Sequence, residues 1–383
     1  MINRLLYKTL KQSKKSLLLL GPRQTGKSTL ISLLSPDLTI NLAHEPTYLD
    51  FARNPHELEQ RLDNLKETHA SIFIDEIQRL PSLLNTIQVL LDKPKNQFRF
   101  LLTGSSARKL KRGHANLLPG RIHSFQLGPI VVSELHYQMP AKKILAHGSL
   151  PGILTDADPL SKEKTLKTYA ATYLKEEVQA ESLTRNLEGF ARFLNISAEW
   201  AGHFLDLSKM AQAAQVPRQS AVRYFEILED CLIVRRTEPF SKSLSRRLVQ
   251  HPKFYFFDNG VLNGLLGNFT VSADRIGLLF EHLIFNQIFH SASGLDLSIR
   301  ISSYRTEHGA EVDFIVEKGS DLYALELKAS LNIGPSDLRG LKRFAECYGK
   351  KHRAMVFYLG ETGKKIDGID ILPWQDGLKE MGL

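Results

Sequence analysis

Residues 21–28 have the types and the spacing of a phosphate-binding loop: Gly21, four further residues, then Gly26, Lys27 and Ser28. An apolar run at residues 17–20 predicts a buried strand before the loop, and residues 28–34 predict a helix after it. In that order, backbone N–H groups face the phosphates, Lys27 reaches the β and γ oxygens, and the Ser28 hydroxyl ligates Mg²⁺. The alternative is a glycine-rich turn that binds nothing. The residues expected to hold ATP are Gly21, Pro22, Arg23, Gln24, Thr25, Gly26, Lys27, Ser28 and Thr29.

Two carboxylates end the next strongly apolar run. Residues 71–76 read Ser-Ile-Phe-Ile-Asp-Glu, so a buried strand carries Asp75 and Glu76 at its end, as in a Walker B element. We expect Asp75 beside the Mg²⁺ ion and Glu76 beside the water that attacks the γ-phosphate. The alternative is a pair of exposed carboxylates. Their place after a complete phosphate-binding loop favours a hydrolytic site.

A third apolar run ends in small polar residues. Residues 98–102 predict a buried strand, and Thr103, Gly104 and Ser105 follow it. In P-loop ATPases of the additional-strand class, a hydroxyl or amide at this strand end lies between the two Walker elements and senses the γ-phosphate. Thr103 and Ser105 are therefore candidate sensors, and Ser105 a candidate nucleotide contact. An ordinary strand-end turn is the alternative.

Basic residues follow this strand end. One of them could act as an arginine finger on the γ-phosphate of a neighbouring subunit, which would require a homo-oligomer. Arg121 is the first choice, because it follows Gly120 and precedes a strand-like run at 122–127. A solvated basic loop is the alternative. The candidates are Arg108, Lys109, Lys111, Arg112 and Arg121.

The last third of the chain holds a second set of acidic and basic residues. A predicted helix at 276–289 carries Glu281, and a predicted strand at 311–317 carries Asp313 among apolar residues. A further predicted strand at 323–329 presents Glu326 and Lys328 on one face, since alternate strand residues point the same way. This order of elements and residues is the pattern of the PD-(D/E)xK nuclease-like fold.

That pattern predicts a catalytic site. Asp313 and Glu326, with Glu281 behind them, are candidate ligands of one or two Mg²⁺, and Lys328 is a candidate to orient the attacking water. Two alternatives remain: an ordinary exposed Glu-Lys pair, or a nuclease-like fold that binds without cutting. Arg305 and His308 fit a polar hairpin loop better than a phosphate contact.

A helix-turn-helix is predicted between these two regions. Residues 207–214 form a short helix, 215–217 a turn, and 218–228 a second helix with Ala221, Phe225 and Leu228 on one face. Residues 232–234 then supply the strand of a wing. Arg218, Gln219 and Arg223 on the other face could meet DNA, although a protein contact is the alternative.

Composition bounds the remaining possibilities. At 383 residues, with 43% hydrophobic and 24% charged residues, the chain is typical of a globular protein of about two to four domains. No stretch approaches the ~18 apolar residues of a membrane span and no secretory leader is evident, so we expect a cytoplasmic protein with no membrane partner. The net charge, 50 minus 41 or +9, permits a DNA partner without requiring one. The basic residues of the first sixteen, Arg4 among them, are expected on a solvated helical face.

The motifs resemble those of a known family. The loop at 21–28, Phe-Ile-Asp-Glu-Ile-Gln at 73–78, Leu-Thr-Gly-Ser-Ser at 102–106 and Gly-Ser-Leu-Pro-Gly at 148–152 are similar to the predicted AAA-plus ATPases of bacteria and archaea. In that family a C-terminal nuclease-like domain has no assigned function. The resemblance runs almost end to end. It implies an α/β protein with a P-loop AAA-plus-like domain at 1–140, a helical lid with a winged helix at 141–245, and a restriction-endonuclease-like α/β domain at 246–383.

Two functions fit these expectations. One is an ATP-driven machine whose nucleotide cycle positions the winged helix and the Asp313, Glu326 and Lys328 site on DNA. The other is a nucleotide-controlled switch that acts on a protein partner and whose nuclease-like domain cuts nothing. ATP and Mg²⁺ are expected in both.

Overall fold

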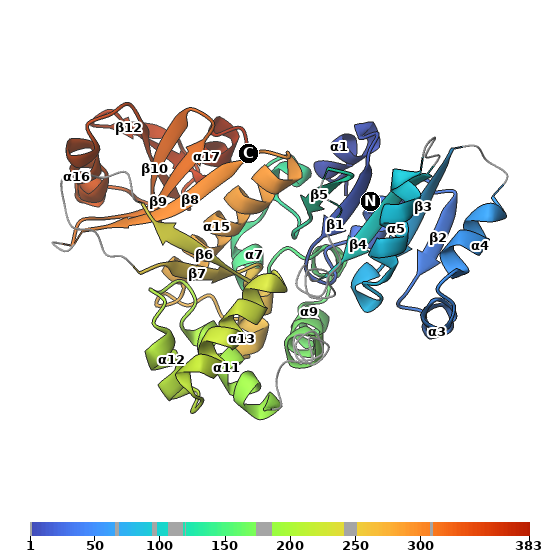
Figure 1. The fold of residues 1–383 in the computed structure, drawn as a ribbon. Helices are drawn as coiled ribbons and strands as arrows, with labels where there is room; N and C mark the ends of the chain where they lie inside the picture. Colours follow the sequence, from blue (N-terminus) through green and yellow to red (C-terminus); the bar gives the residue numbers. More distant parts are fainter. Residues whose placement is uncertain are drawn as a thin grey trace. The chain divides into compact units, whose positions relative to one another are not determined.

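The computed structural model describes residues 2–65, 69–93, 98–105, 118, 120–173, 186–240, 251–306 and 309–383. The chain divides into two compact units (Figure 1). The smaller unit holds Asn3–Gly128 and Ile227–Leu232, and the larger holds Met1–Ile2, Pro129–Glu226 and Ile233–Leu383. The regions predicted as the second and third domains thus fall mostly in one unit, and their separation stays a prediction.

A five-stranded parallel sheet forms the core of the smaller unit. Its order is β2-β3-β4-β1-β5, so β4 pairs with both β1 and β3. Strand β4, which ends in Thr103 and Gly104, therefore lies between the two strands that carry the main motifs. The strands are β1 (Ser16–Leu20), β2 (Leu38–Asn41), β3 (Ala70–Asp75), β4 (Phe98–Gly104) and β5 (Ile122–Gln126).

Helices cover both faces of this sheet because β1 is apolar at every position. Leu17 and Leu19 pack on the side of α1 and α2, whereas Leu18 and Leu20 pack on the side of α4 and α5. A strand that is buried on both faces reads as a continuous apolar run, as residues 17–20 do. The helices are α1 (Leu6–Gln12), α2 (Lys27–Ser32), α3 (Glu45–Arg53), α4 (Glu57–Asp63) and α5 (Leu83–Asp92).

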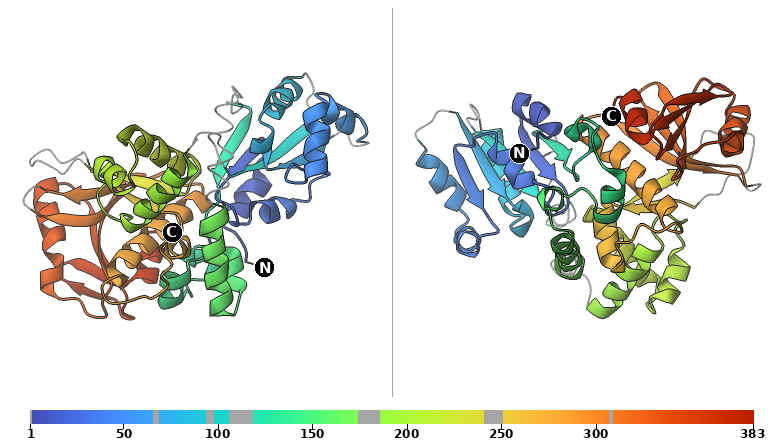
Figure 2. Two further views of the ribbon diagram at one scale, coloured as in Figure 1. Left: turned by 90° about the horizontal axis from the view of Figure 1, so that it is seen from below. Right: turned by 180° about the vertical axis from the view of Figure 1, so that it is seen from behind.

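The larger unit contains an eight-stranded mixed sheet (Figure 2). Its order is β12-β13-β11-β10-β9-β8-β6-β7, and β9 runs antiparallel to both of its neighbours, β8 and β10. The strands are β6 (Val234–Pro239), β7 (Lys253–Phe256), β8 (Ile299–Arg305), β9 (Glu311–Lys318), β10 (Asp321–Lys328), β11 (Arg353–Tyr358), β12 (Lys364–Ile366) and β13 (Ile369–Pro373).

The strand predicted for a wing is part of this sheet. It begins at Val234, pairs antiparallel with β7, and continues through Glu238 and Pro239 into parallel pairing with β8. The helices of the unit are α7 (Ala141–His147), α8 (Pro151–Thr155), α9 (Pro159–Thr168), α11 (Leu187–Glu199), α12 (Leu207–Ala213), α13 (Arg218–Asp230), α14 (Asn259–Leu266), α15 (Ile276–Gly294), α16 (Arg339–Tyr348) and α17 (Trp374–Glu380).

Helix α15 is buried over most of its length and carries a buried histidine. His282 is fully buried, and its Nε2 accepts a hydrogen bond from the Phe256 N–H at 3.0 Å. An imidazole whose Nε2 accepts must carry its proton on Nδ1 and is neutral. Burial, with a smaller contribution from His203, lowers the pKa of His282 from 6.5 to about 3.

Within the described residues, no helix combines the length and the apolar character needed to cross a membrane.

His282 predicts a pH dependence of stability. The pKa of His282 is lower in the folded state than in the unfolded state. Its contribution to the free energy of unfolding is therefore complete above pH 6.5 and is lost as the pH falls toward 3. At pH 4 the loss is about 3 kcal/mol. The two tryptophans, Trp200 and Trp374, both lie in the larger unit, so tryptophan fluorescence in urea follows that unit alone. In His282→Asn, stability should fall less between pH 7 and pH 4 than in the wild type. Equal pH dependence in both chains would contradict a neutral His282.

Candidate functional site

The phosphate-binding loop joins the end of β1 to the start of α2. Gly26 precedes the helix with φ 88°, in the left-handed region that favours glycine. Lys27 is 5% exposed, and its ammonium donates to the carbonyl oxygens of Gly21 at 2.8 Å and Pro22 at 3.0 Å. The loop therefore already holds the lysine charge at its centre, where phosphate oxygens would compete with these carbonyls for it.

The loop is fixed from inside and from the N-terminal segment. The buried Thr25 hydroxyl donates to the Pro22 carbonyl at 2.9 Å. Arg4 donates at 2.7 Å to the carbonyl of Thr25 and at 2.7 Å to that of Gly128. The prediction of Arg4 on a solvated helical face is therefore wrong, because α1 begins after it, at Leu6. No local sequence signal marks this role, since the partners lie 21 and 124 residues away.

The end of β3 places a carboxylate against the loop. Asp75 accepts a hydrogen bond from the Ser28 hydroxyl at 2.8 Å through one oxygen, and from the Thr103 hydroxyl through the other. Strand pairing explains the contact between Asp75 and Thr103, because β3 and β4 run parallel and end at the same edge of the sheet. The structure thus brings together the serine and the aspartate that were predicted to hold Mg²⁺.

Glu76 follows in an unusual backbone conformation. Its φ of 58° is left-handed, and its N–H donates to the Thr103 hydroxyl at 3.3 Å. The buried Gln78 amide donates to the Glu76 carboxylate and, at 2.9 Å, to the Ser105 hydroxyl. Gln78 was not predicted, although it stands two residues after Glu76 in the same motif. It links the predicted base to the predicted sensor.

Arg121 pairs with an acidic residue of its own unit. Its Nε donates to Asp92 Oδ1 at 2.6 Å, and its Nη2 donates to Asp92 Oδ2 at 2.8 Å. Both side chains remain partly exposed, so the pair is a surface interaction of modest strength. A finger at Arg121 would have to leave this carboxylate. The candidates Arg108, Lys109, Lys111 and Arg112 lie outside the described residues.

In the larger unit, the ladder of β9 and β10 ends next to two carboxylates. Its last pair is Phe314 with Leu325, one residue before Asp313 and Glu326. The Leu327 N–H donates to Asp313 at 2.8 Å. Burial, together with the charges of Glu326 and Glu281, raises the pKa of Asp313 well above its usual value. Asp313 and Glu326 therefore share one poorly solvated place at the strand ends.

Lys328 lies on the same face as Glu326, as alternation predicted. Its ammonium donates to Glu326 Oε1 at 2.7 Å. Among the described groups, none donates to Glu326 Oε2, which is buried. Burial raises the pKa of Glu326, and the neighbouring Lys328 lowers it in part. The structure thus brings Asp313, Glu326 and Lys328 close together on adjacent strands.

Glu281 is placed differently from its prediction. Its Oε1 accepts from the Lys253 ammonium at 3.1 Å and from the buried Tyr255 hydroxyl. Within the described part of the chain, no three histidine, cysteine, aspartate or glutamate side chains are grouped to hold a metal ion. The predicted ligand set of Glu281, Asp313 and Glu326 is thus not formed, because Glu281 bonds to a lysine and a tyrosine of β7.

Lys253 and Tyr255 were missed by sequence reasoning. The signal that could have found them is the alternation in β7, which puts both residues on one face of the strand. Their common partner, Glu281 on α15, lies 28 residues after Lys253 and 26 residues after Tyr255. Only the fold brings these elements together.

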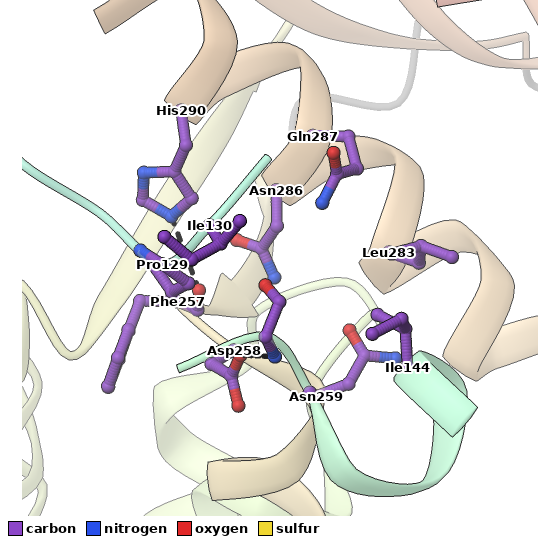
Figure 3. Close-up of a pocket in the computed structure, with 12 residues that line it drawn as sticks. Pro129, Ile130, Ile144, Phe257, Asp258, Asn259, Leu283, Asn286, Gln287 and His290 are labelled. Atoms are coloured by element: carbon purple, nitrogen blue, oxygen red, sulfur yellow. Dashed lines mark hydrogen bonds between the residues drawn. The ribbon is translucent and has the colours of Figure 1, made fainter. Parts of the chain in front are cut away.

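A separate pocket lies inside the larger unit and contains none of the predicted site residues (Figure 3). The Asp258 carboxylate accepts from the backbone N–H groups of Ser149, Gly260 and Val261 at 2.7, 2.8 and 3.1 Å. Burial raises its pKa to about 6, and these hydrogen bonds act against the shift. Asp258 therefore caps α14 and ties residues 148–149 to it.

The helix-turn-helix region agrees with its predicted element pattern. Asp206 caps α12, Gln215 turns with φ 53°, and α13 follows. Ala221, Phe225 and Leu228 are buried as expected. Arg218, Gln219 and Arg223 are exposed, and Arg218 donates to the Ser208 hydroxyl at 3.1 Å.

Comparison with known proteins gives the class of the smaller unit. Residues 13–136 match the family model of an AAA domain. The match covers the phosphate-binding loop and the ends of β3 and β4, so this part of the chain is an AAA-like P-loop ATPase domain. Residues 140–272 and 276–376 match two domains of unknown function, DUF8612 and DUF4143.

Two similar full-length relatives are the uncharacterized proteins Rv2008c of Mycobacterium tuberculosis and Mb2031c of Mycobacterium bovis. Each is 27% identical over 373 residues, which covers 93% of this chain and 80% of the relative. Among solved structures, NtrX from Brucella abortus in complex with ATP has 14% identity and a TM-score of 0.27, over 58% of this chain and 66% of its own. A signal transduction ATPase with numerous domains from Pyrococcus horikoshii has 13% identity and a TM-score of 0.24, over 73% of this chain and 44% of its own. These two scores are too low to bear on function.

Proposed function

We propose that the chain hydrolyses ATP at the P-loop and uses the nucleotide cycle to control its larger unit. The observation that carries the proposal is the 2.8 Å hydrogen bond between the Ser28 hydroxyl and Asp75, beside the buried Lys27. A hydroxyl and a carboxylate in contact are the oxygen donors that Mg²⁺ uses beside a nucleotide. They therefore fit the cation, which neutralises charge on the β and γ oxygens when it is bound.

Each residue of the site has a proposed role. Lys27 binds the β and γ oxygens, and Glu76 orients and polarises the attacking water. Thr103 donates to the Asp75 carboxylate, and Ser105 is linked to the Glu76 carboxylate through the Gln78 amide, so both are proposed to report the state of the γ-phosphate. Arg121 is the proposed finger toward a neighbouring copy, released from Asp92 when copies associate. The loop backbone from Gly21 to Thr29 holds the phosphates.

For the larger unit we propose a winged helix beside a nuclease-like domain that contacts DNA. The order α11, α12, α13, β6, β7 supports the winged helix, and an isolated antiparallel bridge joins Phe204 to Lys253 of β7. Arg218 and Arg223 are exposed on α13 and could meet phosphates. Asp313, Glu326 and Lys328, on adjacent strands, support the nuclease-like fold.

A second candidate is a switch that acts on a protein partner through a nuclease-like domain that cuts nothing. The observation that favours it is the place of Glu281, which bonds to Lys253 and Tyr255 instead of completing a ligand set. The ATPase site is the same in both candidates, so its test is common to them.

Lys27→Ala tests the ATPase proposal. The ammonium is the charge nearest the phosphates, so its loss should weaken binding of ATP by at least about 100-fold and abolish turnover. Titration calorimetry with ATP and Mg²⁺ measures the affinity, and release of phosphate measures turnover. Lys8→Ala, at an exposed position of α1 in the same unit, is the matched control and should keep both. If Lys27→Ala bound ATP as tightly as Lys8→Ala, the P-loop would not be the nucleotide site.

A further inference from the structure

The ammonium of Lys253 lies among the carboxylates of the larger unit. Lys253 is 6% exposed, and its Nζ is 3.1 Å from Glu281 Oε1 and 3.2 Å from Glu311 Oε1. These carboxylates come from α15 and β9, the elements predicted to supply metal ligands. One buried cation therefore already bridges a carboxylate of the helix and a carboxylate of the strand.

The surroundings hold the ammonium in place. The Tyr255 hydroxyl donates to the same Glu281 oxygen that accepts from Lys253. The ring of Phe204 faces the ammonium at 5.6 Å and the Arg305 guanidinium at 5.4 Å, and Phe204 forms a bridge with Lys253 through the backbone. Arg305 also pairs with Glu311, at 3.7 Å. Lysine at position 253 is thus fixed by its strand, two carboxylates and an aromatic ring.

Ion pairs link the cations and the carboxylates of this cluster, and Asp337 is a further carboxylate near Glu326 and Lys328. Three cations, Lys253, Arg305 and Lys328, pair with three carboxylates, Glu281, Glu311 and Glu326. Burial alone would lower the pKa of Lys253, but Glu281, Asp313 and Glu311 outweigh it and raise the pKa above its usual value, so the lysine stays charged.

We propose that Lys253 is a built-in cation that takes the place of Mg²⁺ in the C-terminal site, so that the site holds no divalent cation and cuts no phosphodiester. The Mg²⁺ that the nuclease pattern implies does not fit, because Glu281, the ligand expected from the helix, is already bonded to the Lys253 ammonium. The inference rests on the proposed nuclease-like fold. It leaves the larger unit a binding role in which no metal-activated water is made.

Mn²⁺ binding tests the inference. The parent is the full-length Ser28→Ala chain without nucleotide, which lacks the hydroxyl ligand of the P-loop. Free Mn²⁺ is followed by electron paramagnetic resonance up to about 1 mM, the weak end of protein sites for hard cations. The parent and its Asp313→Asn derivative should bind equal amounts. Lys253→Met in the parent should gain one ion, which adding Asp313→Asn removes again, whereas Lys253→Arg, which keeps the charge, should gain none.

Two outcomes of the Mn²⁺ titration, and one of a DNA cleavage assay, would overturn the inference. One is a Mn²⁺ site in the parent that Asp313→Asn abolishes, and this comparison decides even if Lys253→Met does not fold. The other is a folded Lys253→Met chain that gains no ion. Supercoiled DNA incubated with the wild type, Mg²⁺ and ATP should stay uncut, and cutting that both Asp313→Ala and Lys328→Ala abolish would equally overturn it. Since Mn²⁺ binding is measured without nucleotide, failure of the ATPase proposal would appear in the Lys27→Ala assay alone.

Discussion

Glu76→Gln should bind ATP with nearly wild-type affinity and hydrolyse it about 100- to 10,000-fold more slowly. Glu76 directly follows β3; its carboxylate accepts from the Gln78 amide, and its backbone N–H donates to the Thr103 hydroxyl. Glutamine keeps the size of the side chain and its oxygen acceptor, but it cannot take a proton from water. The change therefore removes a transition-state interaction and leaves the ground-state contacts to the nucleotide.

Single-turnover hydrolysis and ATP affinity should be measured on the same preparation, because the prediction requires one to change and the other to persist. Glu45→Gln is the matched control: this glutamate is 60% exposed and pairs with Arg79 on the surface of the same unit. It should hydrolyse ATP at the wild-type rate. Wild-type turnover in Glu76→Gln would remove Glu76 from the role of base, and loss of ATP binding would assign it to nucleotide binding instead.

Gly148→Ala should destabilise the larger unit by about 3 kcal/mol or more. Gly148 has φ 69° and ψ −163°, a conformation that is nearly confined to glycine. A Cβ there would lie 2.0 Å from Asp258 Oδ1, the buried carboxylate that caps α14. The methyl group and the carboxylate cannot both stay, and moving Asp258 breaks its bonds to Ser149 and to α14.

The test is urea unfolding followed by tryptophan fluorescence, which reports on the larger unit. Gly152→Ala, four residues later at an exposed site of α8 with nothing within 4 Å of its Cβ, is the control. It should be neutral or stabilising by up to ~1 kcal/mol, because alanine loses less entropy in a helix than glycine does. Equal urea midpoints for the two variants would show that the backbone between α7 and α8 adjusts to the methyl group and that Asp258 does not hold it in place.

The parts of the fold that sequence predicted are those encoded by local order. The loop before α2 and the two carboxylates after β3 stand in consecutive residues, and β4 follows from an apolar run with small polar residues at its end. Alternation within one strand was enough to pair Glu326 with Lys328. In each case the partners or the pattern lie within a few residues of one another.

The parts that sequence did not predict depend on contacts between distant elements. Arg4 reaches Gly128, and Lys253 reaches Glu281 and Glu311. An arginine near the N-terminus or a lysine at a strand start looks like any solvated cation until the fold buries it. Glu281 lies on a helix as expected, but its lysine and tyrosine partners could not be read from spacing.

The hairpin of β6 and β7 has a consequence for regulation. Phe225 of α13 packs edge-on against Phe254 of β7 at 5.2 Å, and Arg236 of β6 lies over the same Phe225 ring at 5.8 Å. Phe254 is the neighbour of Lys253 in the chain. If a ligand on the exposed face of α13 shifts this aromatic contact, it changes the free energy of Lys253 among its carboxylates. By reciprocity, neutralising the charge of Lys253 would in that case alter the affinity of α13 for the ligand by the same factor.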